Sequence, residues 1–267
     1  MRFPFSDLLP VGVCGFDSVS AALLECRAKS RLPEEAKSII VYLFPYYLGE
    51  DVYKSCNLSK YAVSKDYHII AGEYLCQAKE LLQRAYPDYS FECFCDNSPI
   101  PEVKAAVNAG LGIKGENGLL INEKYGSFCF IGEIVTDMII EPDAKNEGKC
   151  LQCGMCKKHC PSGALGEQGF CRELCFSHLT QKKGELPLSV TDYIKESKII
   201  WGCDRCQDVC PMNKNAKPTP LKEFLQTAEP VYTLTTDITD RAYSWRGKSV
   251  IDRNFKIMCC KDGENNL

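Results

Sequence analysis

The hydrophobic positions in the first half of the chain alternate between strand-like and helix-like spacing. Residues 38–44 form a continuous apolar run that Pro45 ends, which is typical of a buried strand. From residue 66 to residue 86 the apolar side chains recur every three or four positions, and Pro87 follows them. This spacing predicts a long amphipathic helix. Residues 89–95 predict another strand.

Further elements are predicted between residues 96 and 135. Residues 96–99, Asp-Asn-Ser-Pro, place Ser98 where it can cap a helix and a proline where it suits the first turn. This helix is expected to end near Gly110. Residues 118–122 and 128–135 are expected to pair as a hairpin. Together these elements favour an α+β or α/β fold, with a mixed α/β domain at the amino-terminal end.

The pattern weakens after residue 143, where the composition turns polar. A proline-rich joint, Lys217-Pro218-Thr219-Pro220, follows later. We therefore expect a cofactor and substrate domain at 1–143, a small module at 144–217 and a short C-terminal extension at 218–267.

Two cysteine runs in that module hold most of the chemical information. The first is Cys150-x-x-Cys153-x-x-Cys156-x-x-x-Cys160-Pro161, and the second is Cys203-x-x-Cys206-x-x-x-Cys210-Pro211. In bacterial ferredoxins the first spacing gives three thiolates to one 4Fe–4S cluster and the fourth to another cluster. The runs therefore predict a two-cluster module like that of bacterial ferredoxins.

The crossing pattern assigns most of the cluster ligands. Cluster one is expected to bind Cys150, Cys153, Cys156 and Cys210. Cluster two is expected to bind Cys160, Cys203 and Cys206, and needs one more ligand, for which Cys171 and Cys175 are the candidates. A zinc site is the alternative, but zinc would use only four thiolates and leave the others idle.

The composition indicates an intracellular redox protein. The 267 residues include 18 cysteines, and 45% of all residues are hydrophobic. Because no signal peptide or long apolar stretch is recognisable, we expect reduced thiols, a cytoplasmic location and no membrane contact. The formal net charge of −3 argues against a broad nucleic-acid surface. Basic residues near the clusters leave a local tRNA contact open.

Two 4Fe–4S clusters in a small module form a short electron path, so a plain electron carrier is one hypothesis. The large upstream domain favours an enzyme instead, because such a domain can hold a cofactor or substrate at the end of that path. The chain has neither a Gly-x-Gly-x-x-Gly motif after a strand nor a Gly-Lys-Ser/Thr phosphate loop. A flavin or cobalamin could bind without such a loop.

From residue 32 to residue 213 the chain resembles epoxyqueuosine reductases. The similar segments are Tyr61-Ala62-x-x-x-Asp66-Tyr67-His68, Asp96-x-Ser98-Pro99-x-x-Glu102, Gly110-Leu111-Gly112, Gly132-Glu133-Ile134-x-Thr136-Asp137, Cys175-Phe176-Ser177-His178-Leu179-Thr180 and Trp201-Gly202-Cys203-Asp204-Arg205-Cys206. Within the resemblance, the context of Cys175 favours it over Cys171 as the last cluster ligand.

The resemblance implies a cobalamin-dependent reductase related to reductive dehalogenases. Members of the family reduce the epoxide of epoxyqueuosine in tRNA to the cyclopentene of queuosine, with electrons that an external donor supplies through the clusters. The proton donor is an aspartate in the Asp-x-Ser-Pro segment, which is Asp96 here. An apolar pocket that raises its pKa would suit this role. The alternative is that Asp96 only caps the helix together with Ser98.

The cobalamin contacts follow only from position in the resemblance, which places Tyr61, Ser177 and Asp204 in the cobalamin pocket. The segment from Asp66 to Gly72 is similar to the Asp-x-His-x-x-Gly element that gives cobalt a histidine in other proteins. Its glycine is one place late and the segment begins a helix. His68 is therefore expected to be a structural or pocket residue.

Two departures from the family pattern bear on the substrate. Residues 212–267 are too few for the carboxy-terminal helical repeats with which family members grip tRNA, and the amino-terminal segment is also shorter. In addition, Gly115-Glu116-Asn117-Gly118 has an acid where the family usually has a basic or polar residue. These departures favour, as the alternative, a related reductase that acts on a small molecule.

Overall fold

The computed structural model describes residues 2–260 and groups them into two compact units. The first unit consists of the residues up to Tyr47, Tyr67–Gln152 and Met212–Lys222. The second consists of Leu48–Asp66, Cys153–Pro211 and the chain from Glu223 onward. These interleaved units do not coincide with the three consecutive domains expected from the sequence. Residues 261–267 of the expected C-terminal extension lie outside the described residues.

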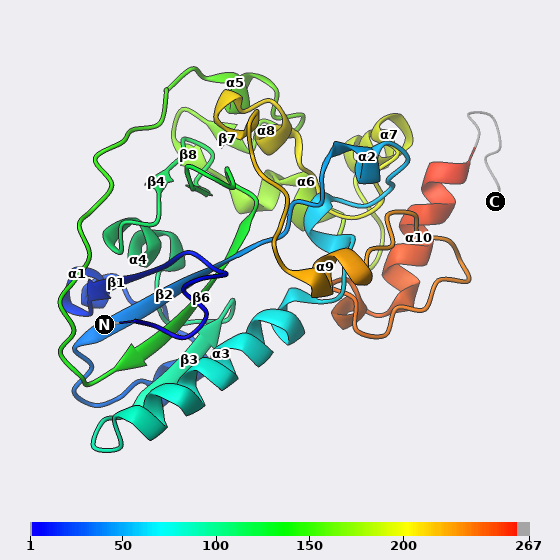
Figure 1. Cartoon of the computed structure of the whole chain (residues 1–267). Coiled ribbons are helices and arrows are strands. Elements are labelled where there is room, and N and C mark those ends of the chain that lie inside the picture. The colour runs from blue at the N-terminus through cyan, green and yellow to red at the C-terminus, as the bar shows by residue number, and fades with distance from the viewer. Residues whose placement is uncertain (1, 261–267) are drawn as a thin grey trace. The chain divides into compact units, whose positions relative to one another are not determined.

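A four-stranded antiparallel sheet forms the centre of the first unit (Figure 1). In spatial order its strands are β1 (Val11–Gly15), β2 (Ser38–Pro45), β6 (Cys129–Thr136) and β3 (Phe91–Cys95). Every residue of β2 is buried, as its continuous apolar run predicts. The predictions of strands at residues 38–44 and 89–95 are confirmed.

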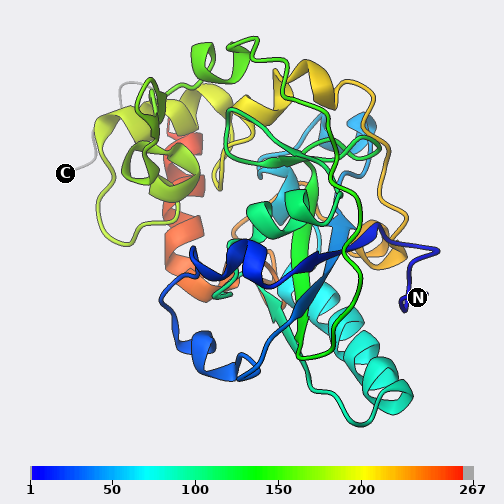
Figure 2. The ribbon, with the colours of Figure 1, turned by 90° about the vertical axis from the view of Figure 1, so that its left-hand side faces the viewer.

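Helices cover both faces of this sheet (Figures 1 and 2). Because successive strand residues point to opposite faces, β6 packs on two different layers. Gly132 of β6 faces Leu75 of α3 (Tyr67–Ala85), whereas Ile131 shares a core with Ala105 of α4 (Glu102–Asn108). α1 (Asp17–Ser20) packs beside α4. The long helix predicted from residue 66 to residue 86 is confirmed, as is the mixed α and β character.

Two local predictions are wrong. β5 (Leu120–Ile121) pairs with β4 (Ile113–Lys114) and not with β6, so the expected hairpin is absent. β6 instead lies between β2 and β3, because both of its faces are apolar enough for a central strand.

α4 begins after Pro101, so Ser98 does not cap it. The Ser98 hydroxyl oxygen accepts the backbone N–H of Ile100 at 3.1 Å, within the loop before the helix.

Short helices make up most of the second unit. They are α2 (Glu50–Tyr53), α5 (Met155–Lys158), α6 (Phe176–Leu179), α7 (Leu188–Ser197), α8 (Arg205–Asp208), α9 (Lys222–Gln226, whose first residue ends the first unit) and α10 (Lys248–Cys259). β7 (Leu165–Gly166) and β8 (Gly169–Phe170) form a small hairpin.

Aromatic side chains hold the core of the second unit. Trp201, Tyr232 and Tyr243 are fully buried and meet edge to face. α10 packs against α7. None of the helices within residues 2–260 is long and apolar enough to cross a membrane.

Candidate active site and cluster-binding segments

Asp96 directly follows β3 and has a left-handed backbone, with φ of 54°. Aspartate tolerates this conformation better than most side chains. The side chain is 62% exposed, and its Oδ2 lies 3.1 Å from Nε2 of His68 on α3. The expectation of an apolar pocket around Asp96 is therefore wrong, because the turn at the end of β3 places the carboxyl at the surface. The contact with His68 agrees with a site role for that histidine.

Two carboxyls that occur in the segments of family resemblance, but to which the sequence analysis assigned no role, lie behind Asp96. Glu133 is on β6, fully buried between Val41 of β2 and Phe94 of β3. Glu102 opens α4, and its carboxylate accepts the backbone N–H of Asp96. In the sequence, Glu133 is a lone acid inside an apolar strand pattern. Burying an acid there costs free energy unless the group is neutral or paired.

Burial raises the pKa of both acids. For Glu102 burial comes first and the nearby carboxyl of Asp96 adds to it, which raises the pKa of Glu102 to about 8. For Glu133 burial comes first and the nearby Glu102 adds to it, so its pKa lies well above the ordinary range. The hydroxyl of Ser98 lies 3.3 Å from Glu133 Oε2 and opposes this shift. The site thus contains three carboxyls, two of which favour the protonated form at neutral pH.

None of the expected cluster ligands forms a disulfide within residues 2–260. Cys150 falls in the last residues of the first unit, and the others fall in the second. No three His, Cys, Asp or Glu side chains within residues 2–260 are placed to hold a single metal ion.

Hydrogen-bond donors surround two of these sulfurs in the second unit. Burial raises the pKa of Cys160, but backbone N–H groups of Leu165, Ser162 and Ala164 more than offset this, so the pKa is lowered. Burial raises the pKa of Cys203 to about 11, and hydrogen bonds from the Tyr193 hydroxyl and the Arg205 backbone N–H oppose this rise without cancelling it. Donors of this kind stabilise thiolates, which is the form that binds iron. The donor set therefore fits cluster ligation.

Cys175 and Cys171 differ in their surroundings. Cys175 precedes α6 and lies close enough to Cys203 to raise the pKa of that thiol, in addition to the larger effect of burial. Cys171 is exposed, and its thiol donates to Glu173 Oε2 at 3.7 Å.

The residues expected to contact cobalamin come together in the second unit. Gln181 Nε2 donates to the Tyr61 hydroxyl at 3.3 Å and to the Ser177 carbonyl at 2.8 Å. Asp204 Oδ2 accepts the backbone N–H of Lys60, the neighbour of Tyr61, at 2.7 Å. Burial raises the pKa of Asp204 to about 6, although Lys60 opposes the shift.

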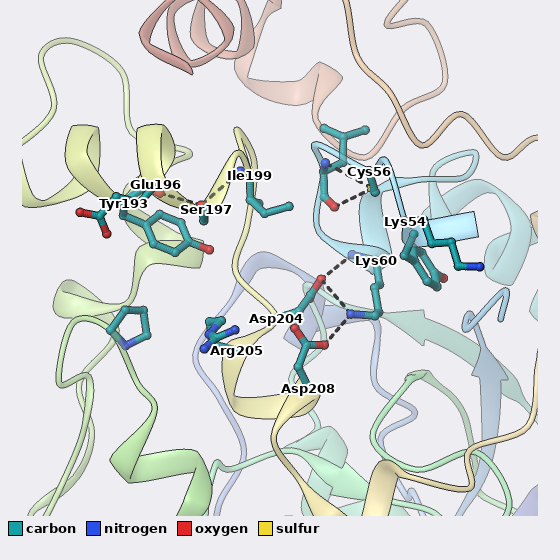
Figure 3. Close-up of a pocket in the computed structure, with 13 residues that line it drawn as sticks. Lys54, Cys56, Lys60, Tyr193, Glu196, Ser197, Ile199, Asp204, Arg205 and Asp208 are labelled. Carbon is teal, nitrogen blue, oxygen red and sulfur yellow. Dashed lines mark hydrogen bonds and ion pairs between the residues drawn. The ribbon is translucent and has the colours of Figure 1, made fainter. Parts of the chain in front are cut away.

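A charged cavity of about 580 Å³ lies on one side of Asp204 (Figure 3). Lys60 Nζ lies between Asp208, to which it donates, and Asp204, at 4.0 Å from the latter. Tyr193 of α7 lines the cavity as well, and its hydroxyl donates to Cys203. The cavity is thus lined by Asp204, one of the three expected cofactor contacts, and by Tyr193, the hydrogen-bond partner of the expected cluster ligand Cys203.

Family models match two stretches of the chain. The model described as "Epoxyqueuosine reductase QueG, DUF1730" matches residues 27–97, and the model of the 4Fe-4S double cluster binding domain matches residues 149–213. The epoxyqueuosine reductase of Cyclobacterium marinum is 33% identical over 238 residues, which is 86% of this chain and 73% of that protein. The chain belongs to the epoxyqueuosine reductase family. The double-cluster match favours iron–sulfur clusters over the zinc alternative.

Comparison with other epoxyqueuosine reductases shows how much of a relative's length this chain covers. The enzyme of Lactococcus garvieae is 33% identical, with 76% of this chain and 61% of that protein covered, so the chain spans less than two thirds of its length. The solved epoxyqueuosine reductase of Streptococcus thermophilus has a TM-score of 0.77 at 25% identity, with 93% of this chain and 76% of that chain covered. A solved epoxyqueuosine reductase with an epoxyqueuosine-modified tRNA-Tyr stem loop also has a TM-score of 0.77 at 25% identity, covering 95% of this chain and 78% of that chain.

Proposed function

We propose that this protein is an iron–sulfur reductase that converts epoxyqueuosine to queuosine in tRNA. The observation that supports this most directly is the position of Asp96, in the loop shared with the family, beside His68 and ahead of two buried acids. The proposal also draws on a related reductase that binds an epoxyqueuosine-modified tRNA stem loop. The reaction would take place in the cytoplasm, with an external reductant.

The cysteines would divide between two 4Fe–4S clusters as the spacing predicts. Cluster one would bind Cys150, Cys153, Cys156 and Cys210, and cluster two would bind Cys160, Cys175, Cys203 and Cys206. The electrostatic effect of Cys175 on the pKa of Cys203 supports this choice over Cys171, whose thiol donates to Glu173.

Cobalamin would be held by polar groups of the second unit. The Tyr61 hydroxyl, the Ser177 hydroxyl and the Asp204 carboxyl are donors and acceptors of the kind that the amide groups around a corrin ring can bind. The Ser177 hydroxyl has no hydrogen-bond partner among the described residues, so it is available to a cofactor. When bound, cobalamin and the clusters supply the electrons of the reaction.

The protein's own contribution at the reacting centre is a proton. Reduction of an epoxide to an alkene breaks both C–O bonds, forms a C=C bond and consumes two electrons and two protons. Asp96 would protonate the departing oxygen, which must leave as a hydroxyl or water and not as an oxide. In one solved epoxyqueuosine reductase from Bacillus subtilis, a catalytic loop that is named after an aspartate is swung out of the active site. An exposed Asp96 agrees with an open loop of this kind.

Asp96→Asn tests the proposal, because the amide keeps the shape and cannot donate a carboxylic proton. We expect the wild type, reconstituted anaerobically with iron, sulfide and cobalamin, to form queuosine in modified tRNA. The variant should lose at least about a hundredfold in rate. Asp88→Asn, an exposed aspartate elsewhere in the same unit, is the matched control and should remain active. Equal iron content in all three proteins shows that the clusters are intact.

Two results would contradict the proposal. A wild type that binds cobalamin but leaves the tRNA unchanged would favour the alternative, a related reductase of a small molecule. A wild type that binds both clusters and no cobalamin, as judged by its visible spectrum, would favour a simple electron carrier.

A further inference from the structure

Glu133 is an acid in the apolar core of the first unit. It shares a sheet face with Ile131 and Val135, whose neighbours across the layer are alanines of α4. Its Oε2 meets the Ser98 hydroxyl, and its Oε1 is buried without a hydrogen-bond partner in the described residues. An ionised carboxylate in this position would be very costly, so the group is held as the neutral acid.

Glu102 links this buried acid to Asp96. Its carboxylate accepts the Asp96 backbone N–H, while its Oε1 is buried and without a hydrogen-bond partner in the described residues. The Glu102 and Glu133 carboxyls interact with each other and with Asp96, so the proton affinities of all three are coupled.

Few other titratable groups face this pair. His68 of α3 faces Glu102 and lowers its pKa, and the Cys14 thiol of β1 faces Glu133. No lysine or arginine contributes to the pKa of either acid within residues 2–260. With no lysine or arginine beside either carboxyl in the described residues, the pair is better suited to storing a proton than to forming a salt bridge.

We propose that Glu102 and Glu133 hold a reserve proton behind Asp96 and return it to Asp96 during turnover. The inference rests on the proposed function and adds the source of its second proton. Asp96 gives its own proton to the oxygen and becomes a carboxylate. Glu102 then reprotonates Asp96, which lets the oxygen leave as water, and solvent restores the proton on the pair. The two electrons come from the external one-electron reductant by way of the clusters, so atoms and charge balance.

A structural role is the competing explanation, because neutral acids at these positions could simply pin the loop that contains Asp96 and Ser98. The two explanations differ in what titrates. A reserve must carry a proton at neutral pH and lose it at a higher pH, whereas a merely structural acid has no effect on the pH dependence of the rate.

Infrared difference spectra of the full-length reconstituted protein test whether the proton is present. The spectrum of wild type minus Glu102→Gln should show a carboxylic-acid band at pH 6 that disappears as the pH rises through about 8. Wild type minus Glu133→Gln should keep this band to higher pH. Glu92→Gln is the matched control on β3: burial raises the pKa of Glu92, but hydrogen bonds from Lys79 and Arg31 lower it overall. Its difference spectrum should show no acid band from pH 6 to pH 9.

The pH profile of the turnover rate tests whether the proton is used. Wild-type kcat should fall as the pH rises past about 8, because Glu102 then no longer holds a proton that it can return to Asp96. Glu102→Gln should lower kcat roughly a hundredfold and remove the fall in rate at high pH, which is the basic limb of the profile. Glu102→Asp should restore part of the rate and part of the basic limb. The Glu92→Gln control should keep the wild-type profile.

Each failure has a distinct meaning. Absence of the acid band would overturn the reserve directly, with no need for activity. A band that is present, together with an unchanged basic limb in Glu102→Gln, would show that the pair is structural and would overturn the inference. Absence of queuosine formation by the wild type would instead overturn the proposed function, and the infrared result would still report on the proton.

Discussion

Gly202 lies between the fully buried Trp201 and the expected cluster ligand Cys203. Its φ of 81° is in the left-handed region, and an added Cβ would lie 2.1 Å from Ser59 Oγ. We expect Gly202→Ala to lower the free energy of unfolding by about 3 kcal/mol, from backbone strain together with the clash. Urea unfolding of the anaerobic apoprotein measures this, and iron analysis should show reduced cluster loading.

Gly154 provides the control for that substitution. It also lies in a cysteine loop and has a φ of 68°, but an added Cβ would meet nothing within 4 Å. Gly154→Ala should therefore cost only the backbone strain, about 1 kcal/mol. Equal losses in the two variants would show that the contact with Ser59 does not matter.

At the residue scale, spacing and resemblance identify the candidate cysteines and Asp96, whose roles stay predictions. The roles of Glu102 and Glu133 could not be predicted in this way. The surroundings of each come from separate segments: β2 and β3 enclose Glu133, and the loop after β3 contacts Glu102. Both acids stand in segments that resemble the family, and Glu133 is also a lone acid in an apolar strand, but a single sequence does not show which residues surround them.

At the element scale, α10 shows how a weakly patterned segment can fix a functional loop. Its Asn254 is fully buried and donates to the carbonyls of Thr180, at 2.8 Å, and Ile200, at 2.7 Å. The Thr180 hydroxyl oxygen in turn accepts the backbone N–H of Gly202, beside Cys203. α10 is thereby tied to the cluster-binding segment of the second unit.

Asn254→Ala should lower the free energy of unfolding by about 3 kcal/mol, because it leaves two buried carbonyls without a donor. Thermal or urea unfolding followed by circular dichroism measures the loss. Lys256→Ala, an exposed substitution on the same helix, should stay within about 0.5 kcal/mol of the wild type. Similar stability of both variants would rule out Asn254 as the link between α10 and this segment.

The spacing of apolar residues predicted the helices and strands that have a long, regular pattern. It did not predict which strands pair with each other. α3 and β2 have long, regular patterns and were predicted correctly. β6 was predicted as a strand but given the wrong partner, because the short stretch before it looked like the other half of a hairpin. Local pattern identifies a strand, whereas pairing depends on strands far away in the chain.

At the scale of the whole molecule, each compact unit is built from segments that are not consecutive in the chain, and this has a physical reason. The second unit closes through contacts between distant segments, such as Asn57 with the backbone of Tyr232 at 2.9 Å and 2.7 Å, and Ser64 with the carbonyl of Phe224 at 2.8 Å. Polar anchors of this kind leave no periodic signal. The linear domain division therefore could not anticipate the interleaved units.

The assignment of cluster ligands is the prediction that involves the largest part of the chain. Fully reconstituted wild type should contain about eight iron and eight sulfide ions. Cys175→Ala should retain about half of them, since cluster two loses a ligand while cluster one is complete, and Cys210→Ala should lose cluster one instead. Cys171→Ala is the matched control and should keep the full content, because its thiol contacts Glu173 at the surface. Iron and sulfide analysis with electron paramagnetic resonance measures all three. Loss of a cluster in Cys171→Ala, together with full iron content in Cys175→Ala, would reverse the assignment of the last ligand. The electrostatic effect of Cys175 on Cys203 would then no longer support the proposed electron path.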